Sequence, residues 1–393
     1  MIAPMSPRPF GLAAAALFMV AIGASRVRAQ ELPRGVVIDD VKCTDDAAQS
    51  YSLFLPSAYR PDRVWSLLIG FHPGARGRAI VETYQAAAEQ YGYIVAASNT
   101  SRNGPWAISM ASVRAMSADL GQRFAVDVNR LYLTGLSGGA RVALQVALTN
   151  NSSIAGVIAS SAGYPDTKPR ASVPFALFGT AGSDDFNYIE MRQLDRKLTS
   201  PHRLAVFSGG HTLPPPPVAL EAIEWMELQA MKSGRRPKDA ALIERLFAKR
   251  QQLVESSASQ PAAVHLLEAA AEDFSGLRDV SPETARAADL SRQPEVKKAL
   301  ARERADDEAE VRLLNDIFEL EAGLRDEQRR AASLGRLRDQ LLRYARAADA
   351  DAESDERSRA RRVLRLVTMG ADERVDDPQY LRLLQEIRTR GRQ

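Results

Sequence analysis

A serine flanked by glycines is the first feature of this chain whose chemistry can be named. Residues 131–148 read LYLTGLSGGARVALQVAL and contain the pattern G-x-S-x-G, with Ser137 at its centre. The alternating apolar residues before Ser137 predict a strand, and the run after it predicts a helix. A serine on a sharp strand-to-helix turn presents its hydroxyl as a nucleophile, and small neighbours are needed because the turn is crowded. The alternative interpretation is only a tight turn.

A nucleophilic serine needs a base, and the chain has four histidines, His72, His202, His211 and His265. His265 lies in a helical pattern near the C-terminus, and His72 precedes the serine. His202 precedes a predicted strand, whereas a parallel sheet carries its site at the carboxyl ends of its strands. His211 follows a predicted strand in SGGHTLPPPP, where glycines allow the loop to turn and prolines stiffen its exit. We expect His211 to be the base, the alternative being a surface-loop histidine.

An acid that orients the histidine should follow the preceding strand. The loop GTAGSDDFNY, residues 179–188, offers both Asp184 and Asp185. Either one would hold the His211 imidazole in the tautomer that accepts a proton from serine. We favour Asp185 because it is nearer the cap of the helix expected after it, which leaves Asp184 as a solvated turn or cap residue.

Two N–H donors should stabilise the oxyanion of a serine hydrolase. The residue after the nucleophile, Gly138, is the first candidate. The second is expected in the loop FHPGARG, where Pro73 has no N–H and Gly74 or Ala75 does. We favour Gly74, and the alternative for this loop is an ordinary glycine-rich turn.

The elements that must position these residues alternate along the first part of the chain. Strand patterns lie at 35–40, 50–56, 65–71, 93–98, 130–136, 154–161, 173–179 and 203–209, and helix patterns lie at about 79–91, 107–124, 138–150, 187–199 and 218–232. Strands that alternate with helices predict an α/β fold with a mostly parallel sheet covered on both faces. No helix pattern separates the first two strands, so the first edge is expected to be antiparallel.

These motifs together resemble the α/β-hydrolase superfamily, over roughly residues 35–232. The pattern is most similar to secreted esterases of the polyhydroxybutyrate depolymerase, feruloyl esterase and dienelactone hydrolase type. Leu213 stands where such esterases commonly have Trp, and His72-Pro73 replaces the usual His-Gly pair. The resemblance implies an α/β-hydrolase fold and a serine esterase that works through an acyl-enzyme, with no metal or organic cofactor.

The substrate is expected to be a small-molecule or polymer-linked ester. The segment SNTSRNGPW, residues 98–106, follows a predicted strand and should overhang the site. Trp106 is predicted to line the substrate pocket, with a core residue at a helix start as the alternative. No long lid segment interrupts the later strands, which favours an open site for a short acyl group or a bulky aryl or sugar ester.

Residues 1–29 are predicted to be a signal peptide. Arg8 precedes the apolar run Gly11–Gly23, and small residues at Val27 and Ala29 predict cleavage before Gln30. An uncleaved anchor is the alternative. The mature chain is then secreted or periplasmic, without membrane contact. The single cysteine, Cys43, allows no internal disulfide and is expected to be buried among apolar side chains.

The composition changes near residues 234–237, which separates a catalytic domain at 30–233 from an all-α region at 234–393. This region is rich in Ala, Leu, Arg and Glu at helical spacing, either repeat-like or coiled-coil. Its longest pattern predicts either two helices broken near Gly323 or Gly335 or one rod. We expect it to serve packing, dimerisation or protein contacts.

Other functions are less consistent with the sequence. The net charge of +3 is small for 393 residues and no basic stripe is present, so nucleic-acid binding is not expected. A serine peptidase of the prolyl-oligopeptidase type shares the order Ser, Asp, His but usually carries a gating domain, which is not visible here. A catalytically dead binding protein with a helical interaction tail would usually lack one member of the triad.

Overall fold

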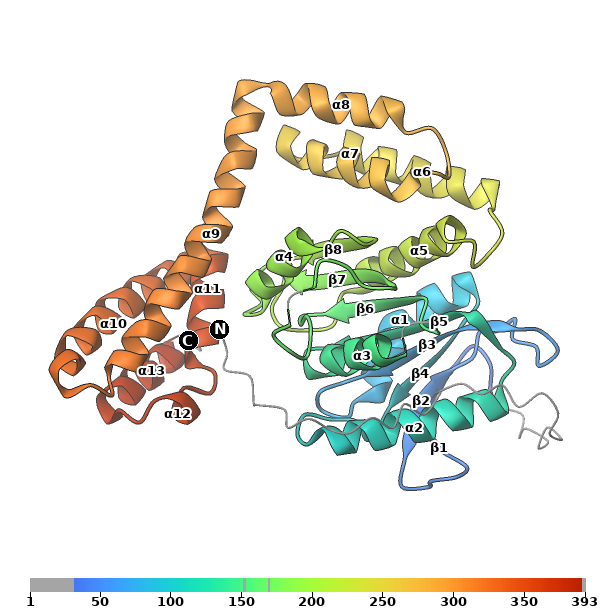
Figure 1. The fold of residues 1–393 in the computed structure, drawn as a ribbon, viewed down its shortest axis with the longest axis horizontal. Coiled ribbons are helices and arrows are strands. Elements are labelled where there is room, and N and C mark those ends of the chain that lie inside the picture. Colours follow the sequence, from blue (N-terminus) through green and yellow to red (C-terminus); the bar gives the residue numbers. More distant parts are fainter. Residues whose placement is uncertain (1–31, 151–152, 169, 391–393) are drawn as a thin grey trace.

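The computed structural model describes residues 32–150, 153–168 and 170–390. The predicted signal peptide and its cleavage site lie outside these residues. Among them, eight strands form one sheet in the order β1-β2-β4-β3-β5-β6-β7-β8 (Figure 1). The strands are β1 (Val37–Lys42), β2 (Ser50–Phe54), β3 (Trp65–Phe71), β4 (Tyr93–Ser98), β5 (Val126–Leu136), β6 (Gly156–Ser160), β7 (Ala176–Gly182) and β8 (His202–Phe207).

The sheet is parallel except at its first edge. β1 pairs antiparallel with β2, and β2 pairs antiparallel with β4, while the strands from β4 through β3 to β8 run parallel to their neighbours. Every residue of β2, β3, β4, β6 and β7 is buried, as expected of strands covered on both faces. The predicted α/β fold, with a mostly parallel sheet covered by helices on both faces and an antiparallel first edge, is confirmed.

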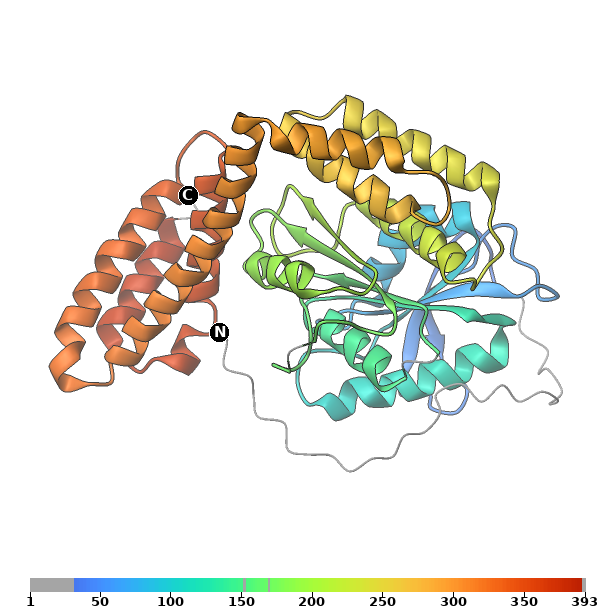
Figure 2. The ribbon, with the colours of Figure 1, turned by 45° about the horizontal axis from the view of Figure 1, so that its top comes forward.

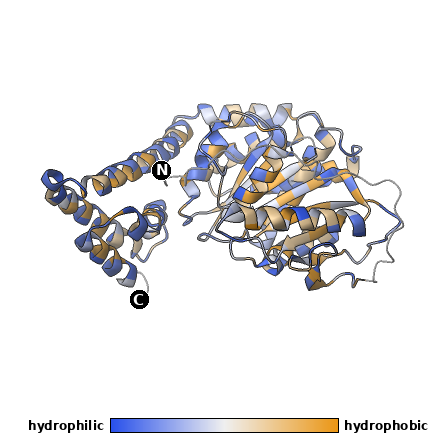
Figure 3. Ribbon diagram, turned by 60° about the horizontal axis from the view of Figure 1, so that its bottom comes forward, coloured by the Kyte–Doolittle hydropathy of each residue, from blue (hydrophilic) through white to orange (hydrophobic). Residues whose placement is uncertain are grey.

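Two apolar cores lie on the two faces of this sheet. One holds the buried sides of α1 (Gly77–Tyr91) and α5 (Pro216–Lys232), and the other holds those of α2 (Trp106–Arg123) and α3 (Gly138–Thr149). Successive side chains of a strand point to opposite faces, so Leu68 enters the first core while Leu67 enters the second. Figure 3 shows the hydrophobic colour concentrated in the strands between these helices.

The C-terminal region is entirely helical, as predicted. Its helices are α6 (Ala240–Glu255), α7 (Gln260–Phe274), α8 (Ser281–Arg292), α9 (Pro294–Gly323), α10 (Glu327–Ala348), α11 (Asp355–Thr368), α12 (Ala371–Arg374) and α13 (Pro378–Arg390). α6 and α7 lie beside α5, α8 lies along α7, and α9 leads away from them to α10–α13 (Figures 1 and 2). We call α9–α13, residues 294–390, the C-terminal bundle.

The long helical pattern breaks at Gly323, while Gly335 lies inside α10. The alternative of one coiled-coil rod is therefore wrong. Asp326 caps the new helix by accepting the N–H groups of Gln328 and Arg329, which satisfies donors that lack an intrahelical partner. The helices then fold back on one another around a shared apolar core that runs from Leu314 to Ile387.

Two further observations concern the chain as a whole. Cys43 is buried and unpaired, as expected, and burial raises the pKa of its thiol to about 12. Within the described part of the chain, no helix combines the length and the apolar content that crossing a membrane requires.

Candidate active site

Ser137 lies on the turn between β5 and α3, with φ 52° and ψ −119°. Positive φ strains a residue that has a Cβ, so the turn must be stabilised by its surroundings. The glycines around it allow that close packing. A Cβ on Gly139 would clash with the carbonyl oxygen of Phe71, and one on Gly135 would clash with the backbone of Gly139. The sequence pattern and the observed turn therefore have the same steric cause.

Backbone strain gathers at one edge of the sheet. Among the described residues, the non-glycine residues with positive φ are Ala75, Ser137 and Ser161. They follow β3, β5 and β6, which are neighbours in the sheet, at the carboxyl ends of these strands. Strained residues that cluster in this way are typical of a functional site.

His211 and Asp185 form a hydrogen-bonded pair at the same edge. The Nδ1 atom of His211 lies 2.8 Å from Oδ1 of Asp185, which is fully buried. The same carboxylate oxygen accepts the backbone N–H of Asn187 at 2.8 Å. Asp184 points elsewhere, because its Oδ2 accepts from Arg361 of the C-terminal bundle at 3.0 Å. Of the two aspartates left open by the sequence, the structure places Asp185 against the histidine.

The loops that carry this pair pack directly on each other. The N–H of Asp184 donates to the carbonyl of Gly209, and that of Ser183 donates to the carbonyl of Phe207, both at 2.8 Å. A Cβ on Gly182 would clash with the carbonyl oxygens of Gly209 and Gly210. Position 182 therefore requires glycine, so that the loop after β7 can lie against the loop after β8.

Ser161 and Asn187 connect the serine turn to the histidine loop, and no sequence pattern indicated either residue. The Ser137 N–H donates to the Ser160 carbonyl at 2.8 Å, and the Ser161 hydroxyl lies 3.5 Å from the Thr212 carbonyl. The Asn187 side-chain amide donates to the Ser161 carbonyl at 2.7 Å. No hydrogen bond joins Ser137 Oγ to His211 among the described residues, and nucleophile–base contacts are often long without substrate.

The two expected oxyanion donors are in different situations. Gly138 is the first residue of α3, where a helix leaves its N–H groups without intrahelical acceptors. The Gly74 N–H instead donates to Nδ1 of His72 at 2.9 Å. The Nε2 of the same ring lies 3.0 Å from the Arg76 guanidinium. Burial and the Arg76 charge lower the pKa of His72 to about 4, so the ring is neutral and only one nitrogen can accept.

The segment expected to overhang the site does reach the serine turn. A Cβ on Gly138 would clash with Oδ1 of Asn103, so this amide lies directly against the nucleophile turn. The Asn103 N–H also donates to the Pro73 carbonyl at 2.8 Å, which ties the segment to the loop after β3. Asn103 is a site residue that the sequence analysis did not single out. Trp106 begins α2 and is 43% exposed, so the core alternative for it is wrong.

The other two histidines lie elsewhere. His202 begins β8, and its Nδ1 is 2.8 Å from the Ser200 carbonyl. His265 is exposed on α7 and pairs with Glu303 of α9 at 2.8 Å. In residues 32–150, 153–168 and 170–390, no group of three or more His, Cys, Asp or Glu is arranged to hold a metal ion.

Solved structures similar to this chain are esterases and related hydrolases. A thermostable esterase is 18% identical with a TM-score of 0.37, and the similarity covers 49% of this chain and 62% of that one. A ferulic acid esterase is 19% identical with a TM-score of 0.36, and the similarity covers 45% of this chain and 91% of that one. An S-formylglutathione hydrolase from Staphylococcus aureus is 14% identical with a TM-score of 0.36, and the similarity covers 49% of this chain and 97% of that one. No family model and no curated protein matches the sequence.

Proposed function

We propose that this protein is a serine hydrolase that cleaves carboxylic esters with Ser137 as nucleophile, His211 as base and Asp185 as the orienting acid. The observation that carries the proposal is the hydrogen bond between His211 and buried Asp185 at the sheet edge where Ser137 occupies its strained turn. A serine between strand and helix and an oriented histidine are the two parts that nucleophilic acyl transfer requires.

Acylation follows from the arrangement of these groups. The Ser137 oxygen attacks the ester carbonyl carbon while His211 Nε2 takes the hydroxyl proton. Asp185 accepts the Nδ1–H and stabilises the positive charge that forms on the ring. The tetrahedral intermediate then collapses, the alcohol leaves with the proton from His211, and the acyl group remains on Ser137.

Deacylation repeats these steps with water. His211 removes a proton from the water as it attacks the acyl-enzyme, and the proton returns to Ser137 as the carboxylic acid departs. The Gly138 N–H is placed to donate to the oxyanion in both halves of the reaction. For Gly74 to serve as the second donor, its N–H must be free of His72. This requires the tautomer in which Nδ1 of His72 carries the proton and Nε2 accepts from Arg76.

Two properties of the proposed enzyme rest on the sequence. An open site suits esters with a short acyl group or a bulky aryl or sugar alcohol, since no long lid segment is predicted. The signal-like segment at residues 1–29 supports export, with a mature chain that begins at Gln30 and acts in the periplasm or outside the cell.

The test is hydrolysis of p-nitrophenyl acetate and butyrate by residues 30–393, with Ser137→Ala as the control. We expect activity that falls at least about 10³-fold in the variant, because no other group can form the acyl-enzyme. Equal rates in the two proteins, or none in either, would contradict the esterase proposal, and peptide substrates would then be tested.

A further inference from the structure

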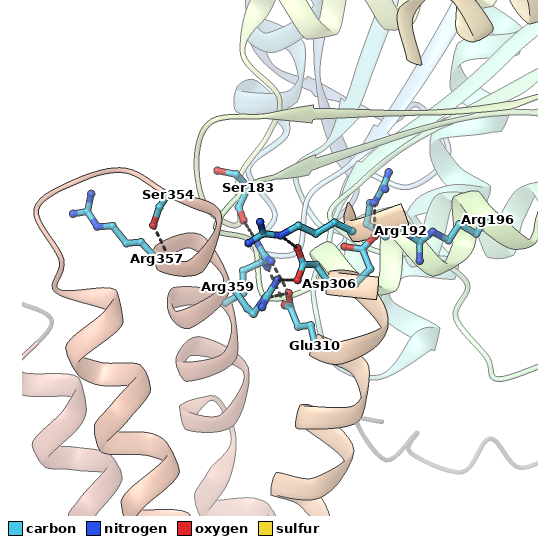
Figure 4. Close-up of polar contacts among 11 residues, drawn as sticks. Ser183, Arg192, Arg196, Asp306, Glu310, Ser354, Arg357 and Arg359 are labelled. Atoms are coloured by element: carbon cyan, nitrogen blue, oxygen red, sulfur yellow. Dashed lines mark hydrogen bonds and ion pairs between the residues drawn. The ribbon is translucent and has the colours of Figure 1, made fainter. Parts of the chain in front are cut away.

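The C-terminal bundle contacts the loop that carries the triad acid. We call residues 183–187 the acid loop; it follows β7 and leads into α4 (Tyr188–Lys197). Figure 4 shows Ser183 of this loop facing side chains from α9 and α11. These contacts join segments that are separated by nearly half the length of the sequence, so no local sequence pattern predicts them.

Phe186 joins the bundle core to the catalytic histidine. Its ring stacks on the His211 imidazole, with 4.0 Å between ring centroids and 23° between planes. The same side chain packs against the apolar core of the C-terminal bundle. A ring held on both sides has few rotamers left, so its position limits where the imidazole can lie.

Arg362 of α11 fixes the first residue of the acid loop. Its guanidinium donates to the Ser183 carbonyl at 2.5 Å. Two other nitrogens of the same group bind the two carboxylate oxygens of Glu310 on α9, at 3.0 and 2.5 Å. Both side chains are buried, and a planar guanidinium held by two parallel bonds has a defined direction. The donor to Ser183 is therefore preorganised by the bundle itself.

Further contacts surround this point. Arg361 pairs with Asp184 at 3.0 Å, and Arg365 lies against Gly210, where a Cβ would clash with its guanidinium. On the far side of the acid loop, Arg192 and Arg196 of α4 bind Asp307 of α9 at 3.1 and 2.5 Å (Figure 4). Contacts thus reach the acid loop, the helix after it and the residue before His211.

We propose that the C-terminal bundle is a positioning element of the active site. Phe186 and Arg362 are its positioning residues, and they hold the acid loop so that Asp185 stays hydrogen-bonded to His211. Neither residue touches the reacting atoms. The test of this inference by esterase activity rests on the proposed function, whereas its test by the NMR signal of His211 does not.

The designed variants separate positioning from folding. Arg362→Lys keeps a positive charge beside Glu310 but cannot span both carboxylate oxygens and the Ser183 carbonyl. Phe186→Ala removes the stacked ring, and Phe186→Tyr restores it. The matched control is Arg374→Lys, since Arg374 of α12 likewise binds both carboxylate oxygens of a buried glutamate, Glu321 of α9, at 3.2 Å each. Among the described residues, Arg374 makes no hydrogen bond or ion pair with the acid loop or with Glu310.

We expect Arg362→Lys and Phe186→Ala to lower kcat about tenfold or more on p-nitrophenyl butyrate with little change in KM. Misplacement of a catalytic group by a fraction of an ångström has effects of this order. Arg374→Lys and Phe186→Tyr should keep kcat near that of the unaltered protein. Equal kcat values in all four variants would overturn the proposal.

The second readout is the NMR signal of the His211 Nδ1–H proton, which a hydrogen bond to a carboxylate moves far downfield. It needs no substrate, and His211→Gln assigns the signal among the four histidines. Loss or broadening of this signal in Arg362→Lys and Phe186→Ala, but not in Arg374→Lys, supports the proposal. An unchanged signal overturns it, including in the case where the protein shows no esterase activity and only the proposed function has failed.

Discussion

Two parts of the helical region attach to the sheet domain in different ways. α6 and α7 share an apolar cluster with α5, in which Leu228 and Met231 meet Leu242 and Phe274. The C-terminal bundle instead reaches the sheet domain through arginines and the aromatic rings of Phe186 and Tyr188. The first attachment continues the hydrophobic core, whereas the second touches the loops that carry Asp185 and His211.

This difference predicts which property of the protein each attachment controls. Apolar burial stabilises the fold in proportion to the area removed from water and has no direction. Hydrogen bonds and ion pairs to a loop add little net stability but fix its geometry. We therefore expect changes at α6 and α7 to alter the free energy of unfolding, and changes at the bundle contacts to alter catalysis.

The largest expected effect distinguishes two neighbouring aspartates. Asp185→Asn should lower kcat by about 10³- to 10⁴-fold, because an amide cannot stabilise the imidazolium and favours the wrong tautomer. Asp184→Asn, which weakens the ion pair with Arg361 and leaves the His211 partner in place, should lower it less than about tenfold. Steady-state kinetics on p-nitrophenyl butyrate measure both. The assignment fails if the two variants lose activity equally.

Phe274→Ala tests the apolar attachment. Phe274 is 1% exposed and meets Phe247 edge to face at 5.2 Å. Removing such a ring costs about 3–5 kcal/mol in the free energy of unfolding. We expect urea denaturation to show this loss while kcat of the folded protein stays within about twofold. A large fall in kcat of Phe274→Ala without a loss in the free energy of unfolding would contradict the idea that the apolar attachment acts on stability.

His72 gives the sheet edge a pH dependence. Its pKa is lowered from 6.5 to about 4, first by burial and then by Arg76. Between these values the unfolded chain binds a proton that the folded chain does not, so stability is complete above pH 6.5 and falls towards pH 4. We expect urea unfolding between pH 6.5 and pH 4 to show a smaller fall in the free energy of unfolding for His72→Gln than for the unaltered protein. Identical pH profiles for the two proteins would contradict the lowered pKa of His72.

The smallest expected effect is that of Arg361→Gln on stability. Its ion pair with Asp184 is partly exposed, and such pairs contribute roughly 0–1 kcal/mol to the free energy of unfolding. We expect a change in kcat of severalfold beside this small change in stability. Arg336→Gln is the matched control, because Arg336 of α10 pairs with Asp316 of α9 at 3.2 Å inside the bundle. If Arg361→Gln lowered the free energy of unfolding by more than about 2 kcal/mol, the bundle contacts would stabilise the fold as the apolar contacts of α6 and α7 do, and the comparison would fail.

Several features were predictable because they depend on local backbone geometry. The glycines around Ser137 predicted its strand-to-helix turn for the steric reason that the structure shows, and the break at Gly323 was among the alternatives. Strand patterns predicted a mostly parallel sheet, since strands buried on both faces need continuous apolar runs. Asn103 and Ser161 were missed because nothing in their sequence neighbourhoods indicates contact with the serine turn.

The sequence by itself determined the strained serine turn, the parallel sheet and the placement of acid and histidine after successive strands. Only the tertiary structure decided between Asp184 and Asp185, which share one sequence context but face different partners. It also decided that the Gly74 N–H donates to His72 and that a helix 177 residues beyond Asp184 supplies its partner Arg361. The physical reason is that steric rules act on neighbouring residues, whereas side-chain pairing depends on which distant elements pack together.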